Sequence, residues 1–230
     1  MGKASARIFA REGAKLVISD ISGAEAQTAA EIGGDIVARC CDVSDEMQVA
    51  ALVEAAVAKF GRLDAMLNVA GVPYGGIPID AVEAEGYDFA MNVILKGVFW
   101  GTKYAVRAMK NNGGGSIINF SSLAGLIPSP NSAVYSSAKA GVAHLTRCTA
   151  VDYGRFNIRA NAICPGMIAT EGMGKMALQH MPQLASANPL GRAGKPEDAG
   201  ELCAFLASDR ANYLNGVIIP LDGGWACKLA

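Results

Sequence analysis

Short apolar runs alternate along this chain with longer stretches in which apolar residues recur every three or four positions. The runs with the length of buried strands are residues 15–19, 36–41, 65–69, 116–120, 158–163 and 217–220. The stretches with helical spacing are residues 3–12, 24–32, 46–60, 89–109, 132–153 and 196–207. Such an alternation is typical of an α/β fold, in which helices cover both faces of a parallel sheet.

A single domain spanning residues 1–230 is the simplest prediction, because the sequence shows no repeat, linker or low-complexity stretch. The least regular region is 165–190, which contains several glycines and the methionines Met167, Met173, Met176 and Met181. A loop of this length within a compact α/β domain is usually functional. Ligands of open parallel sheets bind beyond the carboxyl ends of the strands. We therefore expect residues 165–190, which follow the strand 158–163, to form a substrate-binding loop or lid.

Composition excludes several classes of function. The chain has 20 basic and 21 acidic residues and a net charge of −1, without a basic block, so we expect no binding to nucleic acid or to an anionic membrane surface. The mean hydropathy is +0.25, yet no apolar stretch reaches the roughly 18 residues of a spanning helix. The charged first residues do not resemble a signal peptide. The sequence indicates a soluble, cytoplasmic protein.

A metal site is not expected. The chain has 6 cysteines but no C-x-x-C pair, and its only histidines are His144 and His180. No cysteine has a companion histidine at metal-binding spacing.

The sharpest candidate for chemistry is the pair Tyr135 and Lys139. Residues four apart on a helix lie one turn apart on the same face. An ammonium held near a phenol lowers the phenol's pKa from about 10, so Tyr135 becomes a plausible proton donor and acceptor near neutral pH. The spacing taken alone is weak evidence, and an ordinary pair on a helix surface is the alternative.

Ser122 changes that assessment, because it stands at the end of the strand 116–120, shortly before Tyr135. A strand end and the next helix can bring a hydroxyl and a phenol to one oxygen atom. This arrangement suits a carbonyl–alcohol couple, with Ser122 bonding the oxygen and Tyr135 moving the proton. It does not suit acyl transfer, since the chain has no G-x-S-x-G elbow.

With these residues, a series of short segments resembles the short-chain dehydrogenase/reductase family over nearly the whole chain. The segments are CDV at 41–43, NVAG at 68–71, MNV at 91–93, Tyr-x-x-x-Lys at 135–139, PG at 165–166 and LDGG at 221–224. One such segment means little, but all of them occur in the family's order. The resemblance implies an α/β, Rossmann-type, doubly wound parallel sheet in one domain. It also implies an oxidoreductase that interconverts a secondary alcohol and a ketone by hydride transfer with NAD(P).

The resemblance assigns the catalytic roles to Ser122, Tyr135 and Lys139. Asn92 is implied as the fourth member, holding a water that links Lys139 to solvent. Lys139 is also implied to hydrogen-bond the nicotinamide ribose.

The same resemblance implies a cofactor-binding set. Asp42 and Val43 are expected to contact adenine, and Thr170 the nicotinamide carboxamide. The whole set is Gly2, Asp20, Ile21, Asp42, Val43, Asn68, Ala70, Gly71, Tyr135, Lys139, Pro165, Gly166, Ile168 and Thr170. One departure is Val69, where the family usually has asparagine.

The sequence favours NAD over NADP. Asp20 ends the strand 15–19, where a carboxylate accepts hydrogen bonds from a ribose 2′-hydroxyl and repels a 2′-phosphate. The following Ile21 offers no cation for a phosphate. The substrate is expected to be a small apolar or cyclic secondary alcohol or ketone. This expectation rests on the Met-rich loop and on apolar residues near the expected pocket, namely Tyr74, Leu126, Ile127 and Trp225.

Family members usually associate through the helices that correspond to 89–109 and 132–153, so a homo-oligomer, either a tetramer or a dimer, is expected. Gly97 and Gly101 would permit close packing of the first helix against a partner. Packing of these glycines inside the monomer is the alternative.

The start of the chain departs from the family pattern. The family begins with a central strand and the motif T-G-x-x-x-G-x-G, and Met1–Gly2 align with the last two residues of this motif. The expectation is that the first strand is missing, so that the strands 15–19 and 65–69 each keep an unpaired edge. One hypothesis is an oxidoreductase whose natural form is longer. The alternative is a truncated, cofactor-free subunit or binding module.

Overall fold

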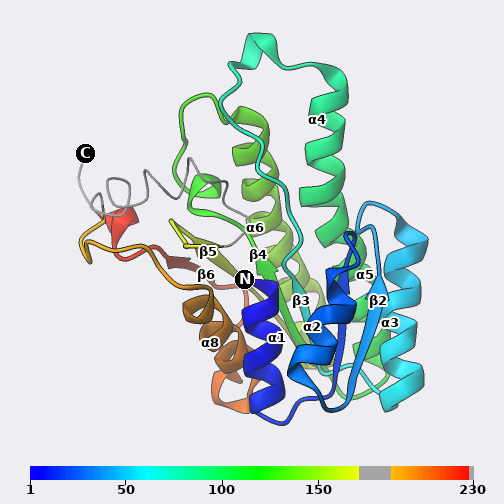
Figure 1. Cartoon of the computed structure of the whole chain (residues 1–230). Coiled ribbons are helices and arrows are strands. Elements are labelled where there is room, and N and C mark those ends of the chain that lie inside the picture. The colour runs from blue at the N-terminus through cyan, green and yellow to red at the C-terminus, as the bar shows by residue number, and fades with distance from the viewer. Residues whose placement is uncertain (171–187, 228–230) are drawn as a thin grey trace.

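The computed structural model describes residues 1–170 and 188–227 of the chain (Figure 1). The helices are α1 (Gly2–Arg11), α2 (Ala24–Ile32), α3 (Glu46–Phe60), α4 (Ala84–Met91), α5 (Gly97–Lys110), α6 (Ala133–Tyr153) and α8 (Pro196–Ala207). The strands are β1 (Leu16–Asp20), β2 (Ile36–Cys40), β3 (Ala65–Asn68), β4 (Gly115–Phe120), β5 (Ile158–Pro165) and β6 (Ile218–Leu221). The alternation predicted from the apolar pattern is confirmed. Outside residues 84–110, the predicted and observed ends of each helix and strand agree to within a few residues.

The expected helix over 89–109 is interrupted. Between α4 and α5, residues Asn92–Lys96 form a π-helical turn, in which the N–H of Gly97 donates to the carbonyl of Asn92. The apolar spacing over 89–109 predicts one continuous helix and does not indicate this turn. Such insertions occur often at functional sites.

All strand pairs are parallel, as expected, but the ladder is divided. In the described part of the chain, β3, β4, β5 and β6 form one sheet in that order, while β1 pairs with β2 alone. Strand β5 and most of β4 are buried, whereas β1 is only half-buried. The sheet is therefore interrupted between β1 and β3.

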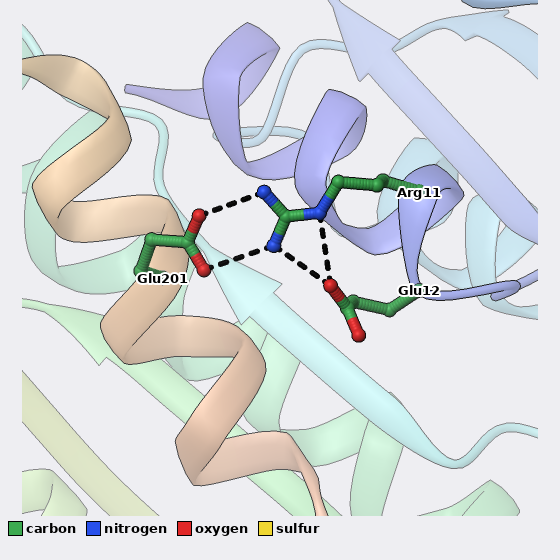
Figure 2. Close-up of polar contacts among 3 residues, drawn as sticks. All are labelled: Arg11, Glu12 and Glu201. Atoms are coloured by element: carbon green, nitrogen blue, oxygen red, sulfur yellow. Dashed lines mark hydrogen bonds and ion pairs between the residues drawn. The ribbon is translucent and has the colours of Figure 1, made fainter.

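Helices α1 and α8 lie side by side on one face (Figure 1). Arg11, at the end of α1, joins them through two hydrogen bonds of 2.9 and 3.0 Å to the carboxylate of Glu201 on α8 (Figure 2). The same guanidinium also donates to Glu12. Arg11 lowers the pKa of Glu201 below its usual value by this bonding. Because both side chains are more than half exposed, this pair adds little stability; the close packing of Gly200 against Ser5 and Ile8 also joins the two helices.

The glycines of α5 pack within the monomer. A Cβ on Gly97 would lie 2.9 Å from a methyl carbon of Val43, and one on Gly101 would clash with the side-chain oxygen of Asn68. The expectation that these glycines admit a partner helix is wrong, and the alternative of internal packing is confirmed. Their missing side chains let α5 approach β3 and the segment after β2.

Candidate active site

The site lies at the carboxyl end of β4. Beyond Phe120 the chain turns through Ser121 and Ser122 into a short 3₁₀ turn, Leu123–Gly125. The oxygen of Ser122 caps this turn by accepting a 3.2 Å hydrogen bond from the N–H of Ala124. This bond holds the Ser122 hydroxyl at the end of the strand.

Tyr135 and Lys139 reach the same place from α6. The Ser122 hydroxyl lies near enough to the Tyr135 phenol to act on its pKa, which it lowers. The Nζ of Lys139 lies 5.8 Å from the centroid of the Tyr135 ring and donates a 2.7 Å hydrogen bond to the carbonyl of Phe120. The fold thus brings together the three residues that the sequence selected.

Burial dominates the protonation of both groups on α6. Lys139 is 4% exposed, and this burial lowers its pKa to about 8, with a smaller opposing effect from Cys164. Burial also raises the pKa of Tyr135, while the Ser122 hydrogen bond acts in the opposite direction. The expectation that Lys139 depresses the pKa of Tyr135 is wrong for this arrangement, because loss of water around the phenol is the larger effect.

Two residues that sequence reasoning missed position Lys139. The hydroxyl of Ser121 donates a 2.7 Å hydrogen bond to the carbonyl of Lys139. A Cβ on Gly125 would lie 2.8 Å from the carbonyl carbon of Lys139. The segment SSLAG at 121–125 could have indicated this contact, because a tight turn packed against a helix needs small residues such as its two serines and its glycine.

Asn92, the implied fourth member, lies in the π-helical turn. In the described residues no hydrogen bond joins its side chain directly to Ser122, Tyr135 or Lys139. A role through an intervening water remains a prediction.

The expected adenosine-binding residues lie in two similar turns. After β1, the Oδ1 of Asp20 accepts 2.8 and 2.6 Å hydrogen bonds from the N–H and hydroxyl of Ser22. After β2, the Oδ1 of Asp42 accepts 2.8 and 2.7 Å bonds from the N–H and hydroxyl of Ser44. Each aspartate thereby stiffens its own loop. Between Asp20 and Ser22, Ile21 is 66% exposed.

Asn68 has a structural role beyond the expected one. Its side-chain N–H donates to Asn119 at 2.8 Å, and Asn119 donates to Thr146 at 2.9 Å. Asn68 is 8% exposed, and the other two are fully buried. This chain of bonds ties β3 and β4 to α6 beneath the Tyr135–Lys139 pair. Asn119 and Thr146 could not be found from the sequence, because both are distant from Asn68 along the chain.

Ala70 and Gly71 follow β3 beside Lys139. A Cβ on Gly71 would lie 3.5 Å from the Nζ of Lys139. Gly2 begins α1 near the same strand end, with its Cβ position 3.9 Å from a methyl of Val69.

The remaining expected cofactor residues follow β5. Pro165 ends the strand, and a Cβ on Gly166 would lie 2.8 Å from the Cβ of Asp222, so the chain passes close there. Ile168 is buried and forms a parallel bridge with Gly194. Thr170 ends the first described range, so most of the expected lid, residues 171–187, lies outside the described residues.

No group of three or more potential metal ligands occurs in the ranges 1–170 and 188–227. No helix in those ranges is long and apolar enough to cross a membrane.

Comparison with known proteins gives consistent matches. A family model described as "Enoyl-(Acyl carrier protein) reductase" matches residues 1–226. The chain is 38% identical to cis-4-hydroxycyclohexanecarboxylate dehydrogenase of Sinomonas cyclohexanicum, over 98% of this chain and 92% of that protein. It is also 38% identical to levodione reductase of Leifsonia aquatica, over 97% of this chain and 89% of that protein.

Solved structures show the same fold. A crystal structure of levodione reductase superposes with a TM-score of 0.93 at 35% identity, over 99% of this chain and 94% of that chain. The structure of ElxO with NADP bound gives 0.92 at 28% identity, with the same coverage.

Proposed function

Because the chain belongs to the short-chain dehydrogenase/reductase family, we propose that Ser122, Tyr135 and Lys139 interconvert a secondary alcohol and a ketone. The observation that supports these roles is the meeting of the Ser122 hydroxyl and the Tyr135 phenol beside the Lys139 ammonium. Two hydroxyls at one point can bond a single substrate oxygen. The relatives are oxidoreductases, and they give no support to the alternative of a cofactor-free binding module.

In the oxidation direction, Ser122 orients the substrate hydroxyl and Tyr135 accepts its proton. The hydrogen on the carbinol carbon leaves as hydride, which a bound nicotinamide dinucleotide would accept. In reduction, Tyr135 returns the proton to the carbonyl oxygen. A protonated Lys139 favours the phenolate form of Tyr135, in opposition to the larger effect of burial, which raises the pKa of the phenol.

The residues present fit a dinucleotide cofactor. Lys139 uses one N–H on the carbonyl of Phe120, which leaves ammonium donors for a ribose hydroxyl. Gly71 keeps the space beside that ammonium free of a side chain. We assign Asp20 and Ile21 to the adenosine ribose, Asp42 and Val43 to adenine, and the remaining residues of the cofactor-binding set as the resemblance implies.

We propose NAD as the preferred cofactor. The Asp20 carboxylate at the end of β1 can accept bonds from a ribose 2′-hydroxyl and would repel a phosphate there. The N–H and the hydroxyl of Ser22 both donate to Oδ1 of Asp20. Its Oδ2 can therefore accept a hydrogen bond from the ribose hydroxyl. ElxO holds NADP, so the two cofactors have to be compared directly.

We propose a cyclic secondary alcohol or ketone as the substrate, on the basis of the two relatives and the apolar residues after β4. Leu126 and Ile127 expose 41% and 43% of their surface beyond Ser122. A homo-oligomer, most simply a tetramer, is proposed from the family resemblance.

The decisive experiment follows NADH absorbance with a panel of ring ketones and with linear ketones of equal carbon number. The proposal predicts turnover of ring ketones, at a higher kcat/KM than that of the linear ketones. Saturable NADH binding without turnover of any ketone or alcohol would contradict it.

A further inference from the structure

Residues 71–77, here the wall segment, leave β3 and run along the first turns of α6. A Cβ on Gly71, at the start of this segment, would lie 3.5 Å from the Nζ of Lys139. At its end, the N–H of Ile77 donates a 3.0 Å hydrogen bond to the carbonyl of Asn131, which precedes α6. The wall segment therefore spans the helical turns that carry the site.

Two glycines let the middle of the wall segment approach the start of α6. A Cβ on Gly75 would lie 3.2 Å from the Oγ of Ser132, so the two chains pass close to each other there. Gly76 has a φ of 80°, which glycine adopts more readily than other residues. Both features keep the segment near α6.

Tyr74 attaches the wall segment to a second helix. A Cβ on Gly86 of α4 would clash with the Tyr74 hydroxyl and would lie 3.0 and 3.2 Å from two carbons of its ring. Any side chain at position 86 would therefore collide with the ring. The tyrosine thus occupies a notch that the absence of a side chain at Gly86 leaves in α4.

Tyr74 also shares a support with the site. It packs against an apolar cluster drawn from α4, the π-helical turn, α5 and α6, and Tyr135 packs against the same cluster. The buried members of the cluster are Ala90, Ile94, Val98, Val134, Ala138 and Val142. A shift of Tyr74 would therefore disturb the surface on which Tyr135 rests.

We propose that Tyr74 is a positioning residue that fixes the wall segment and thereby sets the size of the ring that the site accepts. Among the described residues, no main-chain hydrogen bond joins residues 72–76 to another element, so side-chain packing decides where they lie. A substrate held at the Tyr135 hydroxyl has to fit beside the wall segment. This inference rests on the proposed reduction of ring ketones.

The first test compares cyclohexanone with tert-butylcyclohexanone as substrates of the unaltered chain and of Gly86→Ala. The added methyl group displaces the Tyr74 ring, so the ratio of kcat/KM for the two ketones should change by about tenfold, the usual effect of a methyl-sized change in a pocket. Alanine is a better helix former than glycine, so α4 itself should persist. Glu85→Ala, at an exposed neighbouring position, should leave the ratio unchanged.

The outcomes separate this inference from the proposed function. Turnover of both ketones by the unaltered chain, with the same ratio in Gly86→Ala, would overturn the role of Tyr74 and leave the oxidoreductase function standing. Turnover of no ring ketone by the unaltered chain would contradict both.

A second substitution distinguishes displacement of the ring from general damage to α4. Tyr74→Phe removes the atom nearest to position 86, and the nearest remaining ring carbon would lie 3.0 Å from an added Cβ. Tyr74→Phe alone should change the ratio little, and combined with Gly86→Ala it should restore about half or more of the lost selectivity. A double variant that selects no better than Gly86→Ala would rule out the notch as the cause.

Hydrogen exchange gives a readout that does not depend on activity. The amide of Ile77 is bonded to Asn131 only while the wall segment keeps its place. In Gly86→Ala this amide should exchange about tenfold faster or more, whereas the amide of Val142, within α6, should exchange as before. Equal acceleration of both amides would show general loosening and would overturn the inference. If Gly86→Ala does not fold, Tyr74→Ala, which empties the notch, is measured in the same way.

Discussion

The Nζ of Lys139 donates a 2.7 Å hydrogen bond to the main-chain oxygen of Phe120. This bond links α6 to the end of β4 and holds the ammonium beside the Tyr135 ring. Lys139 is nevertheless almost fully buried, and one carbonyl replaces only part of the water that an ammonium binds. The result is a pKa lowered to about 8.

Lys139 should make stability depend on pH. Its pKa is lowered from 10.5 to about 8 in the folded chain, so the unfolded chain binds more protons between these values. The free energy of unfolding should therefore rise with pH across this window, by up to roughly 3 kcal/mol. Urea unfolding at pH 7, 9 and 10.5, compared with Lys139→Met, measures this contribution. A difference between the two proteins that does not change with pH would contradict it.

Tyr135→Phe should abolish proton transfer while leaving the fold intact. We expect kcat to fall by about 10²–10⁴, the usual contribution of a general acid–base group, with little change in NADH affinity. Stopped-flow turnover and fluorescence titration measure the two quantities. Tyr153→Phe, on the same helix but at its far end, is the matched control and should retain activity. Comparable losses in both variants would point to general damage to α6.

Asp20→Ser should shift cofactor preference toward NADP. The carboxylate that repels a 2′-phosphate is removed, so the ratio of kcat/KM for NAD to that for NADP should fall by about tenfold or more. Asp35→Ser removes an exposed carboxylate before β2 and should leave the ratio unchanged. An unaltered ratio in Asp20→Ser would remove the argument for NAD.

Asn119→Ala should destabilise the fold strongly. It removes the buried acceptor of the Asn68 side-chain N–H and the group that donates to the Thr146 hydroxyl, although that hydroxyl still donates to the carbonyl of Val142. We expect a loss of about 2–4 kcal/mol in the free energy of unfolding. Asn111→Ala, at an exposed position after α5, should cost far less. Chemical denaturation of both variants tests whether the polar chain beneath the site supports the fold.

Several features of the fold and the site could be predicted from the sequence because they depend on local pattern. Apolar periodicity located β1 and α3 nearly to the residue, since each element has to bury one face or both. The spacing of Tyr135 and Lys139 placed them on one face of α6. The strand end before Ser122 indicated where its hydroxyl would lie.

Tertiary structure decided what local pattern does not encode. The π-helical turn at Asn92 is not encoded in the apolar spacing of the segment. Whether Gly101 faces a partner or β3 depends on the position of Asn68, which is distant in sequence. The pKa of Tyr135 was misjudged because a nearby cation can be read from spacing, whereas loss of water can be known only after the surrounding elements have assembled. The sequence thus determined which groups carry the chemistry, and the packed fold determined their protonation and their supports.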